Sequence, residues 1–578
     1  MDKKRHSKQH NLGKRFRSIA SSENVVATAC VGSMVAFLAI LRIGVTNAYS
    51  GVPFWDEWNG SLAFISNFTP ENLGSIFVQH NEHRIILFRL IALFNYHVLN
   101  GQIWFLVAIN LTILVGIVHI LFRYVSLVLE SKWSATPQVK VSLISILVII
   151  ESSWMQEQNI NWGFQSQFLL GIYLPLVAFF LLQKYWLSGK NRTFYLAILF
   201  GVLSAGTFAS GIIVLPLMFL GALICKRNPK ELLSLFLVSV LLVFLYFRGY
   251  STPGQHSNPM ASLFFNTFEV LKYTAVYLLS PVIKSIGEGN AAIILMILAG
   301  LTYATSLFFY RTLTRRNLIF GEGVLVLPIL FLTSFVGLTA LGRANFGARE
   351  ALASRYVSVT LVFYVLITLV FISKRLGSRK LETVHLWVTL ALVIALLMPS
   401  QLHALSRNNN AFDQRLSALG LNLGLRDDVQ VSRIFPNSQY LYEFAPKIIS
   451  ANKGIFGTPL FEKSRSGKNL KISDFKIDVC EVRIDQVFPS SDKSFQKVFG
   501  WSFIPTANQP IGDFLVLSSE GKIVGAGMSG AIRTDVDSYL GMENIDAGFA
   551  FYLMENGTNQ IIVNLSNELV CKLPQVKP

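Results

Sequence analysis

Long runs of apolar residues without a charged side chain limit the folds open to this chain more than any other feature of its sequence. Such runs lie around residues 361–372 and 384–399. About 18 or more uncharged apolar residues in succession are typical of a helix that crosses a membrane. Of the 578 residues, 52% are hydrophobic and only 14% are charged, whereas about 25% of the residues of a soluble domain are charged. The sequence therefore predicts a polytopic α-helical membrane protein with the lipid bilayer as a partner.

Eleven apolar segments are predicted to span the membrane. The first follows a basic stretch and has no cleavage site typical of a signal peptide, so we expect it to be an uncleaved helix that starts in the cytoplasm. Several segments have fewer than 20 residues, and these could be tilted, re-entrant or extended by polar turns. The predicted spans are 24–46, 102–123, 139–153, 168–183, 194–208, 211–225, 231–247, 291–310, 324–341, 357–373 and 383–400.

The charges of the short loops predict how the chain is threaded. With eleven spans, every short basic loop falls on the side of the N-terminus, namely 124–138, 184–193, 226–230, 311–323 and 374–382. Short loops rich in Lys and Arg stay in the cytoplasm. An odd number of spans then places the end of the chain outside the cytoplasm. In a bacterium this predicts a multi-pass protein of the inner membrane, with its last domain in the periplasm.

The composition changes beyond residue 400. Residues 401–578 hold 18 Lys and Arg and 18 Asp and Glu, so the net charge of +17 lies in the first 400 residues. A basic excess confined to the membrane part indicates topology rather than nucleic acid as its cause. We therefore expect a basic cytoplasmic N-terminus at 1–23, a membrane domain at 24–400, a helical connector at 401–430 and a separate water-soluble domain at 431–578.

The last domain is expected to be built from strands. Short alternating apolar runs are separated there by Gly, Asn, Asp and Ser, for example at 514–518, 522–526 and 560–564. This pattern predicts an antiparallel, all-β sandwich. Cys480 and Cys571 lie in this domain. Outside the cytoplasm they could form a disulfide, and two free buried thiols are the alternative.

Two adjacent carboxylates, Asp56 and Glu57, lie between Trp55 and Trp58 in the first outer loop. Neighbouring side chains of a strand or loop point apart, so only one carboxylate can face a given cavity. Partial desolvation raises the pKa of a carboxylate and suits it to accept a proton from a hydroxyl group. The alternatives are an interfacial aromatic pair with two solvated acids, or an acidic pair that caps a helix at 59–68.

The same loop continues with His80, Glu82, His83 and Arg84. His-x-x-His could place two imidazoles on one face of a helix and hold a metal ion, but no clear fourth ligand accompanies them. The group could equally bind a phosphate or sugar hydroxyls. We therefore expect no cofactor; a divalent metal is possible here but not favoured.

Two further outer loops are rich in polar and aromatic side chains. Arg343, Arg349 and Arg355 lie on the side where topology does not explain positive charge. They could neutralise a phosphodiester or contact lipid headgroups from helix ends. The loop 151–167 offers ring faces and amides that could bind a sugar or form an interfacial belt, from Trp154, Asn161, Trp162, Gln165 and Gln167.

Four sequence blocks follow one another between residues 50 and 360: FWDEW, QHNEHRIILFRL, NWGFQSQF and GRANFGAREALASRY. Together they resemble the GT-C superfamily of membrane glycosyltransferases, and more closely a large bacterial membrane family of that type. These enzymes carry a catalytic Asp or Glu in the first outer loop. The end of the chain, with Trp501, Asp535 and Phe549, resembles a small all-β module often found at the end of such transferases; there it could bind an acceptor glycan or be purely structural.

The resemblance implies a sugar donor on polyprenyl phosphate and a periplasmic glycan or glycolipid acceptor such as O-antigen. It gives the role of catalytic base to Asp56, with Glu57 as the alternative. It gives donor-phosphate binding to Arg84, Arg343, Arg349 and Arg355. The expected substrate-binding residues are Trp55, Trp58, His80, Glu82, His83, Arg84, Asn161, Trp162, Gln165, Arg343, Arg349, Arg355 and Tyr356.

Two other functions stay open at this point. A lipid-linked sugar transporter or flippase would need a polar path across the bilayer, and the predicted spans carry few charges deep inside them. A non-catalytic scaffold of an envelope-assembly complex would use the last domain for docking. No hydrolase triad, P-loop or dinucleotide-binding glycine motif is evident.

Overall fold

The structure, a computed structural model, describes residues 2–129, 136–251, 264, 266–315, 318–375, 379–477, 479–555, 560–566, 568–574 and 576. It divides into two compact units. The helical unit comprises Met1–Val45, Gly74–Leu90 and Val107–Leu405, and the C-terminal unit comprises Thr46–Leu73, Ile91–Leu106 and Ser406–Pro578. Two parts of the first outer loop, 47–73 and 91–101, thus group with the end of the chain, and 74–90 groups with the helical unit. The sequence places the whole loop with the membrane domain.

Nine helices in the described part of the chain are long and apolar enough to cross a membrane. They coincide with nine of the eleven predicted spans, so the polytopic helical character is confirmed. These helices are Ser22–Ala48, Ile103–Val128, Pro137–Asn161, Gly163–Ser188, Pro229–Phe247, Ala291–Thr314, Gly321–Phe346, Ser354–Ile372 and Thr383–His403.

The other two predicted spans, 194–208 and 211–225, correspond to the short helices α8 (Asn191–Ala205) and α9 (Val214–Ile224). A helix of 15 residues is about 22 Å long, which is less than the roughly 30 Å hydrocarbon core of a bilayer. The count of eleven is therefore not confirmed.

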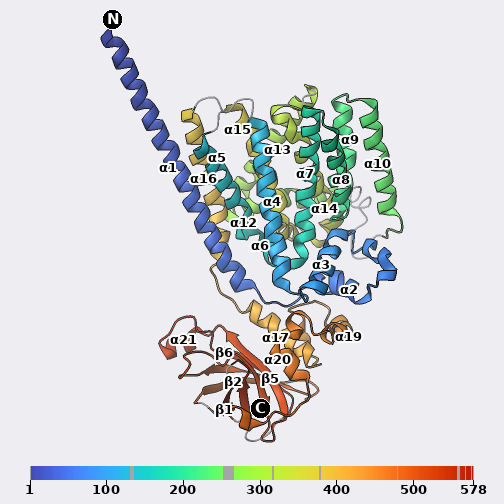
Figure 1. Cartoon of the computed structure of the whole chain (residues 1–578), viewed down its shortest axis with the longest axis vertical. Coiled ribbons are helices and arrows are strands. Elements are labelled where there is room, and N and C mark those ends of the chain that lie inside the picture. The colour runs from blue at the N-terminus through green and yellow to red at the C-terminus, as the bar shows by residue number, and fades with distance from the viewer. Residues whose placement is uncertain are drawn as a thin grey trace. The chain divides into compact units, whose positions relative to one another are not determined.

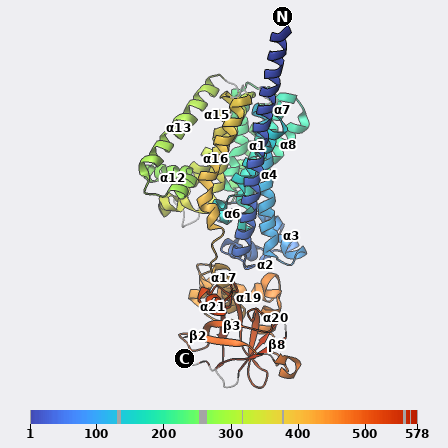
Figure 2. The same cartoon turned by 90° about the vertical axis from the view of Figure 1, so that its left-hand side faces the viewer.

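The helical unit is centred on α7 (Ser166–Ser188), α14 (Val326–Arg343) and α15 (Ser354–Arg375). Phe179, Phe331, Phe335 and Phe363 fill this centre and are fully buried. In contrast, α13 (Ala291–Thr314) lies along the outside of the unit (Figures 1 and 2), and only 6% of its apolar window is buried. The other helices that lie wholly or partly in this unit are α1 (Asp2–Ala48), α3 (Ile86–Val98), α4 (Ile103–Leu129), α5 (Pro137–Glu151), α6 (Glu157–Asn161), α10 (Pro229–Phe247), α12 (Thr267–Ile286) and α16 (Arg379–His403).

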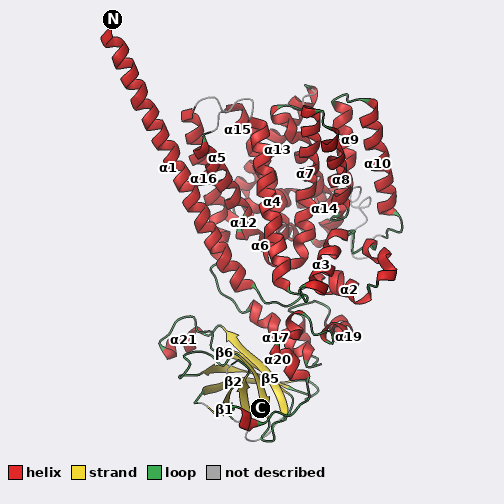
Figure 3. Cartoon of the chain, viewed as in Figure 1, coloured by secondary structure: helices red, strands yellow, loops and turns green. Residues whose placement is uncertain are grey.

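The described strands all lie in the C-terminal unit (Figure 3) and form a single eight-stranded sheet in the order β1-β8-β7-β4-β5-β6-β3-β2. The predicted strands 514–518, 522–526 and 560–564 are confirmed as β4, β5 and β7. The predicted sandwich of two sheets is wrong. The strands are β1 (Lys476–Ile477), β2 (Glu481–Pro489), β3 (Gln496–Phe503), β4 (Asp513–Leu517), β5 (Ile523–Ala531), β6 (Gly548–Leu553), β7 (Ile561–Asn564) and β8 (Leu569–Lys572).

Helices, rather than a second sheet, cover one face of this sheet. Leu515 and Tyr552 on that face share a core with Leu416 and Leu419 of α17 (Asn410–Asn422). The opposite face buries its own cluster, which includes Phe514 and Phe551. Because both faces are covered, all six residues of β6 are buried and alternation is lost. The remaining helices of this unit are α2 (Ala63–Asn67), α18 (Asp428–Val431), α19 (Ser438–Ile449), α20 (Pro459–Arg465) and α21 (Thr534–Leu540).

The segment 401–430, predicted as a helical connector, contains the helix α17. Phe412, Leu416 and Leu419 of α17 are buried in the core that the sheet completes. Val52 and Trp58 of the first outer loop belong to the same core. The C-terminal unit is therefore an α+β domain that includes the acidic loop.

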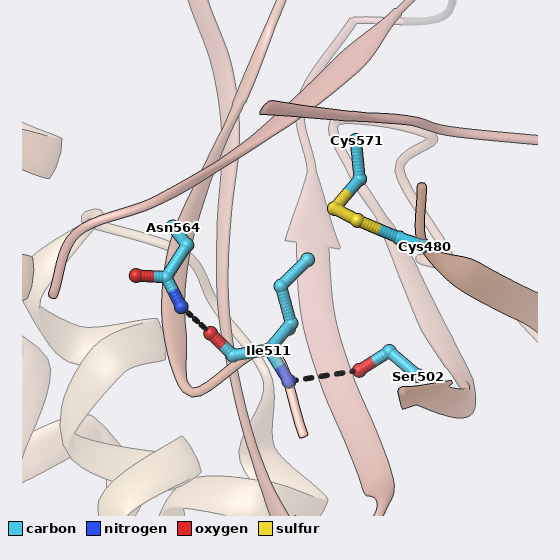
Figure 4. The surroundings of a disulfide bond; sticks show 5 residues. All are labelled: Cys480, Ser502, Ile511, Asn564 and Cys571. Carbon is cyan, nitrogen blue, oxygen red and sulfur yellow. Dashed lines mark hydrogen bonds between the residues drawn. A yellow bond between two sulfur atoms is a disulfide. The ribbon is translucent and has the colours of Figure 1, made fainter. Parts of the chain in front are cut away.

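Cys480 and Cys571 form a disulfide, with 5.7 Å between their Cα atoms (Figure 4). The bond closes a segment with a sequence separation of 91. Close by, the side-chain amide of Asn564 donates to the carbonyl of Ile511, and the Ile511 N–H donates to Ser502 Oγ at 3.4 Å. Of the two alternatives for these cysteines, the structure shows the paired one.

Candidate functional site

The acidic pair lies in a tight turn of the C-terminal unit with an unusual backbone. Trp55 has a φ of +46°, which is an outlier for a bulky residue and occurs mainly at functional or strained positions. A π-helical stretch, Glu57–Leu62, follows at once. Such stretches are rare in proteins, and those that occur often lie at functional sites. The Glu57 N–H donates to Phe54 O at 3.0 Å, and the Phe54 N–H donates back to Glu57 Oε2 at 2.7 Å. The Glu57 carboxylate therefore holds the turn closed.

The two carboxylates have different surroundings, as the sequence predicts for neighbours. Glu57 is 2% exposed and lines a cavity of about 30 Å³ together with Ser61, Asn95 and Tyr96. That volume is large enough for a water molecule. Asp56 is partly exposed and makes no side-chain bond that caps the helix. The capping alternative therefore does not describe Asp56.

The segment around His80 to Arg84 is not a helix. His80 and His83 pair through their backbones, with the His80 N–H donating to His83 O at 2.8 Å and the His83 N–H donating to His80 O at 2.9 Å. His83 Nδ1 accepts from the Ala209 N–H at 3.1 Å, so the proton of a neutral ring lies on Nε2, which is 3.3 Å from Glu82 Oε1. The helical His-x-x-His arrangement is therefore wrong. Within the described residues, no group of three or more His, Cys, Asp or Glu side chains could hold a metal ion.

His80 and Arg84 have positions that suit structural roles. The surrounding protein desolvates the His80 ring and, with His83 and Arg89 nearby, lowers the pKa of the imidazole to about 4. The Arg84 guanidinium donates to the carbonyls of Tyr246 (2.7 Å), Arg248 (2.7 Å) and Phe77. These bonds attach the segment 80–84 to the end of α10. They favour a role for Arg84 in positioning this segment rather than in binding a donor.

Three tyrosine hydroxyl groups lie around one guanidinium group in the helical unit. Arg343 Nη2 donates to Glu82 Oε1 at 3.1 Å. Tyr273 and Tyr277, one turn apart on α12, and Tyr356 on α15 are buried and interact electrostatically with Arg343. The Tyr273 and Tyr356 side chains interact with each other, and the Tyr277 hydroxyl has no hydrogen-bond partner within the described residues. We call Glu82, Arg343, Tyr273, Tyr277 and Tyr356 the hydroxyl–arginine cluster.

The other two outer arginines differ in exposure. The Arg355 guanidinium bonds to Glu350 and lies 5.0 Å from the centre of the Tyr356 ring, at the edge of the hydroxyl–arginine cluster. Arg349 bonds to Glu288 at 3.0 Å with its side chain 86% exposed. The structure thus brings Arg343 and Arg355 to the cluster and leaves Arg349 on the surface.

The loop 151–167 is mostly buried, and several of its oxygen atoms have no hydrogen-bond partner in the described part of the chain. Trp154 and Trp162 are 6% and 7% exposed, so neither offers an open face for stacking. Gln165 is buried as well. Asn159 Nδ2 bonds to Arg355 O at 2.7 Å and joins this loop to α15. Buried acceptor oxygens with no hydrogen-bond partner among the described residues are those of Glu151 (both oxygens), Asn159, Asn161 and Gln167.

An apolar cavity of about 250 Å³ lies among the candidate membrane-spanning helices. It is lined by residues of α4, α5, α15 and α16, among them Leu147, Leu361 and Leu397. Leu392 also lines it and is 66% exposed, so the cavity reaches the exposed side of α16. Its volume exceeds the roughly 150 Å³ of an apolar cavity that holds a benzene molecule.

Sequence reasoning missed Tyr273, Tyr277 and Glu151. The signal for the two tyrosines was their i, i+4 spacing, which places them on one face of an amphipathic helix. Residues 252–263 and 265, which precede this helix, lie outside the described residues. Comparisons of the chain with protein-family models, curated proteins and solved structures found no match.

Proposed function

We propose that this protein is a membrane glycosyltransferase, which moves a sugar from a polyprenyl-phosphate donor to a periplasmic acceptor such as a surface glycan. The observation that carries the proposal is the hydroxyl–arginine cluster: among the described residues its buried Tyr277 hydroxyl has no partner, and Tyr273 and Tyr356 have only each other. A buried polar group without a partner costs about 1–3 kcal/mol. A phosphate oxygen would accept from these hydroxyls and from Arg343, since hydrogen bonds to charged groups are the strong ones.

Other features of the helical unit suit the remaining parts of such a donor. The acceptor oxygens of Glu151, Asn159, Asn161 and Gln167, which lack partners among the residues that the structure describes, are complementary to hydroxyl donors, and sugars are rich in hydroxyl groups. The apolar cavity at α16 would take a hydrocarbon chain that enters from the bilayer.

Asp56 would act as the base in this reaction. It would take the proton of the acceptor hydroxyl while that oxygen bonds to the anomeric carbon of the sugar. The bond from this carbon to the phosphate oxygen breaks, and polyprenyl phosphate leaves with the electron pair. The leaving group gains charge as the bond breaks, which cationic and hydroxyl donors stabilise. Glu57 would position the turn, because its carboxylate accepts the Phe54 N–H.

The proposed orientation follows from the basic loops. Since α8 and α9 are a pair, counting both or neither gives eleven or nine spans, and either number is odd. A phosphatase reporter fused after Pro578 should be active, and a reporter that works only in the cytoplasm should be silent.

The decisive experiment is transfer by the purified protein in lipid, with a labelled polyprenyl-phosphate sugar and a glycan acceptor. Appearance of labelled acceptor and free polyprenyl phosphate supports the proposal. Movement of the intact donor across the bilayer without transfer would favour a transporter. Binding of envelope proteins without transfer or transport would favour a scaffold.

A further inference from the structure

The acidic turn, residues 54–58, packs against residues 431–578 of the same C-terminal unit, which we call the C-terminal domain. The Trp55 N–H donates to Ile434 O at 2.8 Å, so a residue of the last domain satisfies the backbone at the strained position. Trp58 is fully buried, and its ring lies 6.2 Å from that of Phe456. Trp58 Nε1 also donates to Pro53 O at 2.8 Å, which fixes the indole within the turn.

The same domain also contacts residues 91–106, which lie next to the turn. The Gly454 N–H donates to Asn100 O at 2.7 Å. Lys453 Nζ donates to Tyr96 O at 2.6 Å and lies 4.2 Å from the centre of the Tyr96 ring. Tyr96 lines the small cavity that Glu57 also lines. Two separate loops of the C-terminal domain therefore brace the acidic turn from two directions.

We propose that the C-terminal domain is a positioning element of the catalytic apparatus, with Phe456 and the Gly454 loop as its contact points. The domain holds Trp55 in its left-handed backbone conformation and so directs the side chain of the next residue, Asp56. This inference rests on the proposed role of Asp56 as the base. It accounts for the inclusion of residues 46–73 and 91–106 in the core of the last domain.

The first test compares Phe456→Leu with Phe495→Leu in the full-length protein. Both phenylalanines are buried in the same core, so both changes remove similar apolar volume, but the Phe456 ring packs on Trp58 whereas the Phe495 ring packs on Tyr552. We expect faster hydrogen exchange of the peptide 54–58 and a fall in kcat of up to about 10²-fold in Phe456→Leu, with the donor KM unchanged. Phe495→Leu should have the kcat and exchange of the wild-type protein.

The second test uses two glycines with positive φ. A Cβ at Gly454 would meet the Gly101 carbonyl oxygen at 2.9 Å, whereas a Cβ at Gly467 meets nothing within 4 Å. Gly454 and Gly467 have φ values of +58° and +60°, so alanine is strained equally at both. Only Gly454→Ala should move residues 91–106, and only it should lower kcat and loosen the peptide 54–58.

These readouts separate the two proposals. Full transfer by Asp56→Asn would overturn the base role, whatever the exchange data show. If Asp56→Asn abolishes transfer but Phe456→Leu and Gly454→Ala match their controls in kcat and in exchange, the positioning role is wrong. Faster exchange at 54–58 without any loss of kcat would also overturn it, because the brace would then not serve catalysis.

Discussion

Arg343 and Glu82 form a bond of 3.1 Å between residues that are 261 positions apart in the chain. Each side chain of the pair is 22% exposed, so the bond is partly shielded from water. Glu82 also lies 3.3 Å from His83 Nε2. The carboxylate thereby fixes the guanidinium next to the buried tyrosines and joins two of the sequence blocks that suggest the function.

Arg343→Ala should raise the donor KM and lower kcat, because the guanidinium would contact a charge present in both the ground state and the transition state. Arg349→Ala should have a much smaller effect, since that side chain is exposed and surface ion pairs contribute little. Steady-state transfer kinetics measure both. Equal losses in the two variants would contradict the assignment.

Tyr277→Phe should weaken donor binding without destabilising the protein. It removes a buried hydroxyl that has no partner of normal geometry in the described structure, so the melting temperature should stay the same or rise. A lost bond to a charged group corresponds to roughly 10- to 100-fold weaker binding. Donor binding and thermal unfolding are measured together.

Tyr124→Phe is the matched control for that variant. Tyr124 is also fully buried, but its hydroxyl donates to Leu176 O at 2.9 Å. The change should lower stability and leave donor binding as in the wild-type protein. If the two variants behave alike, the tyrosine hydroxyls of the hydroxyl–arginine cluster do not bind the donor.

Asp56→Asn should abolish transfer with little effect on folding, because a positioned base contributes roughly 10²–10⁴ in rate. Glu57→Gln should do less, since the amide oxygen of glutamine can still accept the Phe54 N–H. Initial rates at saturating donor distinguish the two. Normal transfer in both variants, with normal expression, would exclude the acidic turn from catalysis.

The stability of the helical unit should depend on His80 below neutral pH. The pKa of His80 is lowered from 6.5 to about 4 in the folded state, so between these values the unfolded chain binds more protons. The free energy of unfolding then falls as the pH drops from 7 toward 4. His80 contributes on the order of 1 kcal/mol to this loss at pH 5. Thermal unfolding at pH 7 and pH 5 should show a smaller decrease for His80→Gln than for the wild-type protein.

Removal of the disulfide should destabilise the C-terminal unit. The bond between Cys480 and Cys571 closes a long segment, and loss of a native disulfide typically costs about 2–5 kcal/mol. Cys571→Ser should therefore increase proteolysis of residues 476–572 more than of the helical unit. Thiol labelling of the denatured, unreduced wild-type protein should find both cysteines blocked, and reactive thiols at both positions would remove the claim.

Local patterns predicted much of this fold. Apolar runs located nine helices that are long enough to cross a membrane, and alternation located β4, β5 and β7. The sandwich prediction failed because alternation shows only that one face of a strand is buried. It does not show whether helices or another sheet cover that face. In β6, where both faces are covered, the pattern disappears.

The candidate site could be predicted only in part for a related reason. Trp154 and Trp162 have the composition of a sugar-stacking surface, but their burial depends on neighbours that are distant in sequence. The i, i+4 pair Tyr273 and Tyr277 looks like an ordinary helix face until Tyr356 and Arg343 are placed beside it.

By itself, the sequence determined the membrane character of the chain, its change of composition near residue 400 and the residue types available for chemistry, because these depend on local hydropathy and charge. Only the tertiary structure decided which residues meet. It joined Glu82 to Arg343, buried Glu57 beside Asn95, and packed Trp58 against Phe456. Such contacts form where segments that are distant in sequence pack into one core. The spacing of these residues along the chain does not indicate which of them will meet.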